Sequence, residues 1–279
     1  MRRFMLIWPL VVFAFLSGRA SAQSADPLAG VEHVFDRPAA LAELRQPTIC
    51  ILDIQHPNSI RKQVEGKSAG QYNGWRTKSR VEEITGLPCL LVHYGEVPPD
   101  QLRQPNLKAI LISGRSEVIS KELDRRFYPL IRETRVPIFG FCGGMQLISE
   151  AFGVKVEPMR KLREGEKDPN PNYRPGWFKE WGFLPVKVVQ GDPLFAGLPD
   201  EILVRQAHAE HALEPPPGFV LLASTAECRV QAIKHKDRPI YGAQFHPEAY
   251  DDAHPHGRTI LENFFRSVGI IRKDGPGAR

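Results

Sequence analysis

Pro137-Ile-Phe-Gly-Phe-Cys-Gly-Gly-Met-Gln-Leu-Ile-Ser-Glu150 joins a short apolar run to a glycine pair and then to a helical pattern. Residues 137–141 have the composition of a buried strand, because they form a brief apolar run bounded by a turn signal. From residue 143 onward, apolar side chains recur at the spacing of one helix face. The sequence therefore predicts that Cys142 lies where a strand turns sharply into a helix.

Such an elbow suits a nucleophile. Gly140 and Gly144 stand two residues to either side of Cys142 and leave room for the backbone to fold back on itself. The N-terminus of the following helix points N–H groups and a partial positive charge at the sulfur, which favours the thiolate. Cys142 is thus a candidate nucleophile, and the alternative is a buried structural cysteine beside a tight turn.

A second motif, Ile240-Tyr-Gly-Ala-Gln-Phe-His-Pro-Glu248, begins as a strand and ends in a histidine and a carboxylate. Pro247 disfavours a helical conformation at His246, and alternate residues of an extended segment share a face. Glu248 can therefore fix the imidazole of His246 and stabilise the imidazolium that forms during proton transfer. Cys142, His246 and Glu248 make a complete set of nucleophile, base and orienting carboxylate.

In these two motifs the chain resembles the class I (triad) glutamine amidotransferases. Residues 140–146 match their nucleophile pattern G-x-C-x-G-x-Q, and residues 244–248 match their histidine motif. Asp192-Pro-Leu-Phe-Ala-Gly-Leu-Pro199 is similar to a segment of the amidotransferase domain of GMP synthetases. The resemblance covers residues 47–270.

The resemblance also implies roles for other residues. The backbone N–H groups of Gly143, Gly114 and Arg115 would form the oxyanion hole, and Gln146 and His208 would help to bind the substrate. The family usually has a second glycine where this chain has Arg115. A torsion that only glycine adopts would disturb this hole.

Strands and helices alternate along the chain, which predicts an α/β fold with a largely parallel sheet. The resemblance implies the three-layer, flavodoxin-like form of that fold. We expect strands at 48–54, 89–94, 108–112, 137–141, 154–158, 181–189, 202–206, 218–224, 229–234 and 239–245. We expect helices at 39–44, before Gly86, from Ile119 to Ile131 with Pro129 kinking or restarting the helix, and at 255–268. The elbow and Ser113-Gly114 would then lie beyond the carboxyl ends of strands.

The chain begins with the three parts of a secretory signal peptide: a basic start, an apolar run at 4–16 and the small-residue end Ala20-Ser-Ala22. We expect cleavage after Ala22 and an exported protein, periplasmic or secreted, with no later segment that spans a membrane. An uncleaved membrane anchor is the alternative. The predicted organisation is a signal peptide (1–22), a leader (23–46), one amidotransferase-like domain (47–270) and a tail (271–279).

Charge and cysteine content exclude other classes. Loss of the three arginines of the signal peptide would lower the formal net charge from +5 to +2, which gives no case for nucleic-acid binding. Cys50 and Cys89 are expected to be buried small hydrophobes, and Cys228 is unassigned. The cluster Asp251, Asp252, His254 and His256 is interpreted as a solvated helix start, so neither a metal nor a cofactor is expected.

The resulting prediction is a stand-alone hydrolase of glutamine or a γ-glutamyl compound, acting through a thioester. The sequence shows no phosphate-cradling motif of the Walker type, and export would separate the protein from ATP. A glutaminase subunit that feeds ammonia to a separate synthetase is the first alternative. A non-catalytic binding module and a cysteine peptidase of a related fold are the others. Residues 159–180 are either a lid over the site or a surface excursion.

Overall fold

The computed structural model describes residues 28, 30–66 and 69–272. The predicted signal peptide, its cleavage point after Ala22 and most of the predicted tail lie outside these residues. Among the described residues, no helix has the length and apolar character needed to cross a membrane.

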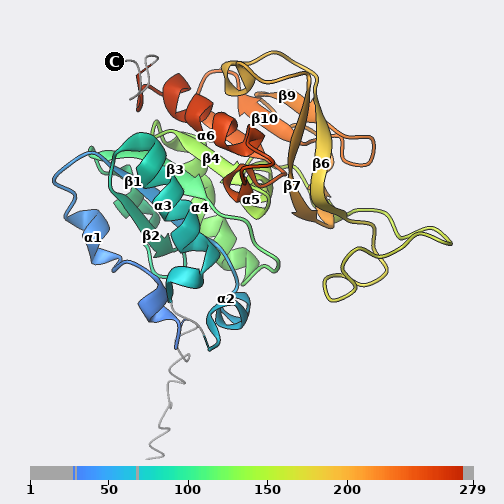
Figure 1. Cartoon of the computed structure of the whole chain (residues 1–279). Helices are drawn as coiled ribbons and strands as arrows, with labels where there is room; N and C mark the ends of the chain where they lie inside the picture. The colour runs from blue at the N-terminus through green and yellow to red at the C-terminus, as the bar shows by residue number, and fades with distance from the viewer. Residues whose placement is uncertain (1–27, 29, 67–68, 273–279) are drawn as a thin grey trace, which may run out of the picture.

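A nine-stranded sheet forms the centre of the molecule, in the order β2-β1-β3-β4-β11-β10-β9-β6-β7 (Figure 1). Its strands are β1 (Thr48–Asp53), β2 (Cys89–His93), β3 (Leu107–Ile112), β4 (Ile138–Phe141), β6 (Glu180–Val188), β7 (Glu201–His208), β9 (Phe219–Ser224), β10 (Ala232–His235) and β11 (Ile240–Ala243). The five strands from β2 to β11 are parallel, as predicted. The remaining strands extend the sheet by antiparallel pairing. A short antiparallel pair, β5 (Val156–Pro158) with β8 (Glu210–Ala212), lies beside it.

Helices cover both faces of the parallel half. They are α1 (Ala39–Ala42), α2 (Pro57–Val64), α3 (Asn73–Thr85), α4 (Lys121–Glu133), α5 (Gly143–Ala151) and α6 (His256–Ser267). Short 3₁₀ turns occupy Glu32–Val34, Ala69–Gln71, Pro99–Arg103, Pro193–Phe195 and Pro247–Ala249. Each core strand is buried on both sides, which explains the continuous apolar runs of the sequence.

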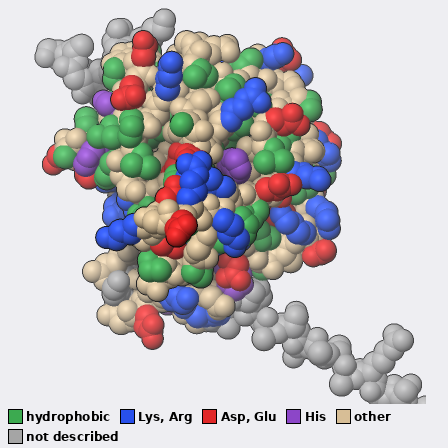
Figure 2. All heavy atoms as spheres, turned by 90° about the vertical axis from the view of Figure 1, so that its right-hand side faces the viewer, with side chains coloured by type: hydrophobic (Ala, Val, Ile, Leu, Met, Phe, Trp, Pro, Cys, Tyr) green, Lys and Arg blue, Asp and Glu red, His purple; other side chains and the backbone are tan. Residues whose placement is uncertain are grey.

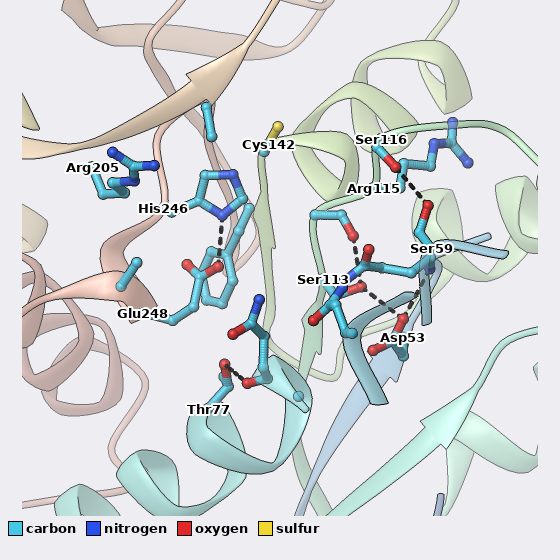
Figure 3. Close-up of a pocket in the computed structure, with 18 of the residues that line it drawn as sticks. Asp53, Ser59, Thr77, Ser113, Arg115, Ser116, Cys142, Arg205, His246 and Glu248 are labelled. Atoms are coloured by element: carbon cyan, nitrogen blue, oxygen red, sulfur yellow. Dashed lines mark hydrogen bonds and ion pairs between the residues drawn. The ribbon is translucent and has the colours of Figure 1, made fainter. Parts of the chain in front are cut away.

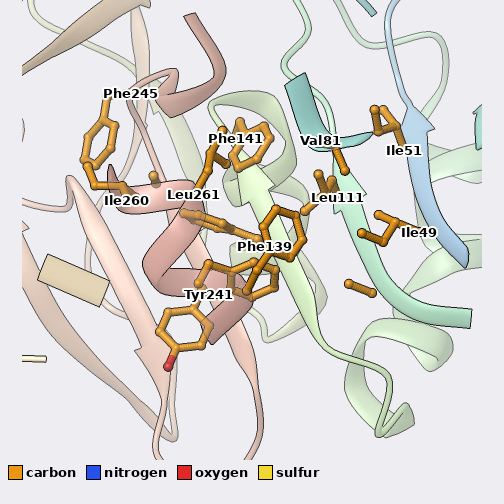
Figure 4. Close-up of a cluster of buried hydrophobic side chains, with 14 of the residues drawn as sticks. Ile49, Ile51, Val81, Leu111, Phe139, Phe141, Tyr241, Phe245, Ile260 and Leu261 are labelled. Atoms are coloured by element: carbon orange, nitrogen blue, oxygen red, sulfur yellow. The ribbon is translucent and has the colours of Figure 1, made fainter. Parts of the chain in front are cut away.

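Successive side chains of a central strand point into two separate hydrophobic cores, one on each face of the sheet. Ile49 and Phe139 belong to the core against α3 and α6, part of which Figure 4 shows, whereas Cys50 and Ile138 face α4 and α5. This alternation follows from the two-residue period of a strand. The expected three-layer α/β fold is therefore confirmed. Part of the predicted leader joins the first core, because Leu28, Val31, Val34 and Phe35 are buried there.

One helix differs from its prediction. Helix α4 begins at Lys121 after the N-cap Ser120, so Ile119 lies before it, and the helix continues through Pro129 to Glu133. Proline removes one backbone hydrogen bond, but buried Phe127 and Leu130 hold the helix to the core on both sides of it. The helix therefore does not restart at Pro129.

Candidate active site

Cys142 occupies the strand–helix elbow that its flanking sequence predicts. Strand β4 ends at Phe141 and α5 begins at Gly143, while Cys142 itself has φ +48° and ψ −106°. A non-glycine residue in this region is strained, and such strain is typical of functional sites. A Cβ atom on Gly144 would lie 2.3 Å from the Ile112 carbonyl oxygen, and one on Gly140 would lie 2.5 Å from the backbone of Gly144. Only glycine fits at either position.

The pairing of β11 with β4 brings His246 to Cys142. Residue 243 pairs with residue 141, and the chain then turns through the 3₁₀ turn at Pro247–Ala249. The Nδ1 of His246 lies 2.7 Å from the Glu248 carboxylate, and Figure 3 shows Cys142 at the other side of the ring. Burial lowers the pKa of His246, but the charges of Glu248 and Cys142, together with hydrogen bonds to both, outweigh it and raise that pKa well above its ordinary value. The structure thus favours an imidazolium in this position.

The expected oxyanion-hole residues lie against the elbow. A Cβ atom on Gly143 would be 2.8 Å from the backbone nitrogen of Arg115, which shows how closely the two segments approach. A Cβ atom on Gly114 would be 2.7 Å from Cε1 of His246, so glycine is needed there to make room for the imidazole. Arg115 has no positive φ and therefore does not need the torsion of the glycine it replaces. Arginine can therefore occupy this position, where the family usually has glycine, without a positive φ.

Two glutamines form a hydrogen-bonded chain behind the sulfur. The Gln244 side-chain amide donates to Cys142 Sγ at 3.5 Å, and the Gln146 amide donates to Gln244 Oε1 at 3.3 Å. Gln244 was not predicted as a site residue, although the histidine motif contains it. The Gln244 side chain therefore contacts the nucleophilic sulfur directly. Gln146 thus acts on the nucleophile through Gln244.

Gln146 and His208, predicted to bind the substrate, are not among the residues that line the cavity at Cys142. Gln146 is 6% exposed and also donates to the carbonyl of Glu210. His208 is 1% exposed and donates through Nε2 to the Glu180 carboxylate at 2.9 Å. The structure thus places both side chains outside the cavity, and their contact with a substrate stays a prediction.

Glu180, His208 and Cys228 offer ligand atoms within 4.8 Å of one another, all buried. The Glu180 carboxylate already accepts hydrogen bonds from His208, Thr225 and Gln231. These neighbours satisfy both of its oxygens, which suits a structural network. In the cluster after Glu248, the His254 ring and the Asp251 carboxylate form an exposed hydrogen bond of 2.7 Å, and His256 accepts a hydrogen bond from the backbone of Leu203.

The other cysteines differ from Cys142 in their surroundings. Cys50, Cys89 and Cys228 are free and buried, and burial raises the pKa of each thiol. A thiol held neutral is a poor nucleophile. The prediction that Cys50 and Cys89 are buried small hydrophobes is confirmed, with exposures of 0% and 2%.

A cavity of about 410 Å³ opens over Cys142, His246 and Glu248. Its far wall is polar and comes from the end of β1, the start of α3 and the segment that joins them: Asp53, Gln55, Ser59, Gln63, Asn73, Arg76 and Thr77. Asp53 ends β1 and is 1% exposed, and it accepts a hydrogen bond from Tyr72. It accepts another from Ser113, which lies beside it in Figure 3. Burial raises the pKa of its carboxyl group. This wall was not predicted, although the position of Asp53 at a strand's carboxyl end is a signal for it.

Residues 159–180 reach the same cavity. Tyr173 lines it and lies 6.2 Å, between ring centres, from Trp181. The segment is held by its own ion pairs, Arg160 with Glu166 at 2.6 Å and Lys179 with Asp168 at 2.7 Å. Figure 2, which looks onto this side of the molecule, shows basic and acidic side chains interspersed. Through Tyr173 the segment forms part of the cavity wall.

The chain matches a known protein family and several known proteins. The family model "Glutamine amidotransferase class-I" matches residues 80–268. One of the subunits of the glutamine-hydrolysing GMP synthase of Pyrococcus abyssi is 34% identical over 207 residues, which are 73% of this chain and 97% of that protein. The GMP synthase of Staphylococcus carnosus is 33% identical, but the match spans 34% of its length.

Solved structures agree with these relatives. A putative GMP synthase subunit from Thermoplasma acidophilum superposes with a TM-score of 0.58 at 27% identity, covering 81% of this chain and 94% of that one. A glutamine amidotransferase from Thermotoga maritima has a TM-score of 0.54 at 14% identity, covering 81% and 98% of the two chains, which is a likeness of fold.

Proposed function

The chain belongs to the class I glutamine amidotransferases, and from this membership we propose that it hydrolyses the γ-amide of glutamine or of a γ-glutamyl compound through a thioester on Cys142. The observation that carries the proposal is the line of contacts from Glu248 to His246 to Cys142 at a strained elbow. Nucleophile, proton carrier and orienting carboxylate are all present in the order that such chemistry needs.

The proposed reaction has two steps. The Cys142 thiolate attacks the γ-carbonyl carbon, and the backbone N–H groups of Gly143 and Arg115 receive the oxyanion. The His246 imidazolium protonates the leaving nitrogen, so that ammonia or an amine departs and a thioester remains. His246 then takes a proton from water as the water attacks the thioester, which releases the glutamyl acid and restores the Cys142 thiolate and the His246 imidazolium.

The cavity supports a substrate range wider than glutamine. The cavity of about 410 Å³ extends beyond Cys142 to a polar wall that includes Asp53, Asn73 and Thr77. The polar wall from Asp53 to Thr77 lies outside the residues 80–268 that match the family model. We therefore favour γ-glutamyl amides with a polar leaving group alongside glutamine itself.

A second candidate function is that of a glutaminase subunit that supplies ammonia to a separate synthetase. The observation that favours it is the match to the P. abyssi protein, which is named as one subunit of a GMP synthase and is matched over 97% of its length. A non-catalytic binding module is disfavoured, because the one residue that supported it, Arg115, has an ordinary backbone.

Turnover of purified protein separates the two functions. The chain from Gln23 onward, and a Cys142→Ala variant, would be incubated with glutamine, γ-glutamyl methylamide and γ-glutamylglycine, and the release of glutamate and of ammonia or amine measured. Release that depends on Cys142 and needs no partner supports the stand-alone hydrolase. Labelling of Cys142 by a glutamine-like electrophile without turnover supports the subunit function. Neither labelling nor turnover contradicts both functions.

We also propose that the protein is exported, on the strength of residues 1–22. The test is expression of the full chain in a bacterial host, followed by fractionation of the cells and N-terminal sequencing of the product. A mature protein that starts at Gln23 in the periplasm or medium supports export. A cytoplasmic product that retains residues 1–22 contradicts it.

A further inference from the structure

Arg205 lies directly beside the proposed catalytic base. It belongs to β7, and its carbonyl oxygen accepts a hydrogen bond of 2.8 Å from the backbone N–H of His246, in an isolated antiparallel bridge between the two residues. Its side chain lines the cavity that holds Cys142. Figure 3 shows Arg205 and Arg115 on opposite sides of the His246 ring. The backbone pairing thus fixes where Arg205 enters the site.

The guanidinium group of Arg205 has no anionic partner among the described residues. It lies 5.4 Å from the ring centre of Trp181, and burial lowers its pKa. Of the other arginines of the cavity wall, Arg115 binds the Asp124 carboxylate, whereas Arg76 is exposed and donates to the neutral side chain of Asn73. A partly buried cation without a counter-ion is unfavourable, because it loses hydration and gains no attraction in return. The cavity therefore has a cationic group that a bound anion would neutralise.

The acidic groups of the cavity wall do not supply that anion. Glu248 is bound to His246, and Asp53 accepts hydrogen bonds from Tyr72, Ser113 and the backbone of Gln55. An arginine presents two parallel N–H groups that match a carboxylate, and stacking on an aromatic ring restricts its orientation.

We propose that Arg205 binds a carboxylate of the substrate, with Trp181 holding the guanidinium in place. This inference rests on the proposed function, and it adds the group by which the substrate is recognised. Two parts of a γ-glutamyl compound carry such a group: the α-carboxylate of the glutamyl moiety, and the carboxylate of an amino-acid leaving group. The chemistry is the same for both, and substrates that carry one or neither of these groups distinguish them.

The test compares the wild type with Arg205→Gln and Arg205→Lys. The substrates are glutamine, γ-glutamyl methylamide, γ-glutamylglycine and 4-aminobutanamide, which is glutamine without its α-carboxylate. For the substrates that carry the bound carboxylate, Arg205→Gln should raise KM about 10- to 100-fold with kcat nearly unchanged, because a charged hydrogen bond made in the ground state is lost. The KM of Arg205→Lys should lie between those of the wild type and Arg205→Gln, because lysine keeps the positive charge but cannot present two parallel N–H groups.

The substrates show which carboxylate is bound. If it is the α-carboxylate, Arg205→Gln raises KM for the three substrates that carry this group and leaves KM unchanged for the analogue that lacks it. If it is the leaving-group carboxylate, only γ-glutamylglycine is affected. An equal loss on every substrate, or no loss on any, overturns the proposal. Arg125→Gln, an exposed arginine on α4, controls for the change in net charge.

A binding measurement separates this inference from the proposed function. In the Cys142→Ala background, calorimetric titration with glutamine, γ-glutamylglycine and 4-aminobutanamide needs no turnover. Weaker binding of the carboxylate ligands alone on Arg205→Gln substitution supports the inference, even if wild-type protein hydrolyses nothing. An affinity for the carboxylate ligands that the Arg205→Gln substitution leaves unchanged overturns the inference, and so does the absence of binding of any carboxylate ligand.

Discussion

The Arg115 guanidinium and the Asp124 carboxylate form a two-pronged ion pair inside the protein, with N–O distances of 2.7 and 2.9 Å and side-chain exposures of 4% and 0%. Asp124 belongs to α4, and Arg115 belongs to the loop whose backbone meets Gly143. The pair therefore attaches the proposed oxyanion loop to a rigid helix. In this chain a side-chain tether takes the place of the family's second glycine.

Substitution of Arg115 by alanine should lower the free energy of unfolding by about 3–5 kcal/mol, because Asp124 would remain buried without a partner. The value of kcat should also fall, since the loop is no longer held. Urea unfolding and glutamate release measure the two effects. The double variant Arg115→Met, Asp124→Leu should recover most of the stability. A loss below about 1 kcal/mol in the single variant, the range of exposed ion pairs, would argue against the tether.

Substitution of Glu248 by glutamine should reduce kcat on the order of 10²- to 10⁴-fold, because the imidazolium loses its orienting charge. It should also change the pH profile. The carboxylate helps to raise the pKa of His246, so its removal lowers that pKa. His246 must be protonated to release the leaving nitrogen, so the alkaline limb of kcat/KM should move to lower pH. A limb that stays in place would mean that another group titrates there.

Replacing Cys142 by glycine should relieve backbone strain at the elbow while removing the activity. Its φ of +48° suits glycine, so Cys142→Gly is expected to be about 1 kcal/mol more stable than Cys142→Ala. Both variants should lose activity by at least about 10³-fold. Chemical denaturation of the pair, compared at matched protein concentration, measures the difference. Equal stabilities would indicate that the elbow is not strained.

Substitution of Gly144 by alanine should destabilise the protein by about 1–3 kcal/mol or more, because the new Cβ would lie 2.3 Å from a backbone oxygen that cannot move away. Gly191→Ala is the matched control. Its Cβ would meet nothing within 4 Å, and its φ is not positive, so its effect should stay within about 0.5 kcal/mol. Similar effects from both would show that the elbow can relax.

The fold and the core of the site could be predicted because their signals are local. The apolar run before Cys142 and the helical spacing after it specify an elbow, and Pro247 holds His246 out of a helix. Both motifs follow parallel strands, which the topology places side by side. The prediction that Cys142, His246 and Glu248 come together agrees with the geometry, and their catalytic role awaits the experiments above.

The remaining features depend on contacts that are distant in sequence. Arg205 enters the cavity because β7 happens to bridge His246, and no pattern near residue 205 encodes that pairing. Tyr173 reaches the site from a segment without a hydrophobic period. The partners of the strands in the antiparallel half of the sheet are set by tertiary packing, so their residue ranges were predictable while their order was not.

The adjacency of β4 and β11 also bears on biosynthesis. The nucleophile is translated well before the base, and β11 completes the parallel half by pairing with β4 after the antiparallel strands between them in sequence have been made. Domains fold as cooperative units, and such non-local pairing is slow. An incomplete chain, whether still on the ribosome or truncated, therefore carries an isolated thiol without its proton partner. The enzyme can therefore become active only after β11 has paired with β4, and activity shows that this pairing has formed.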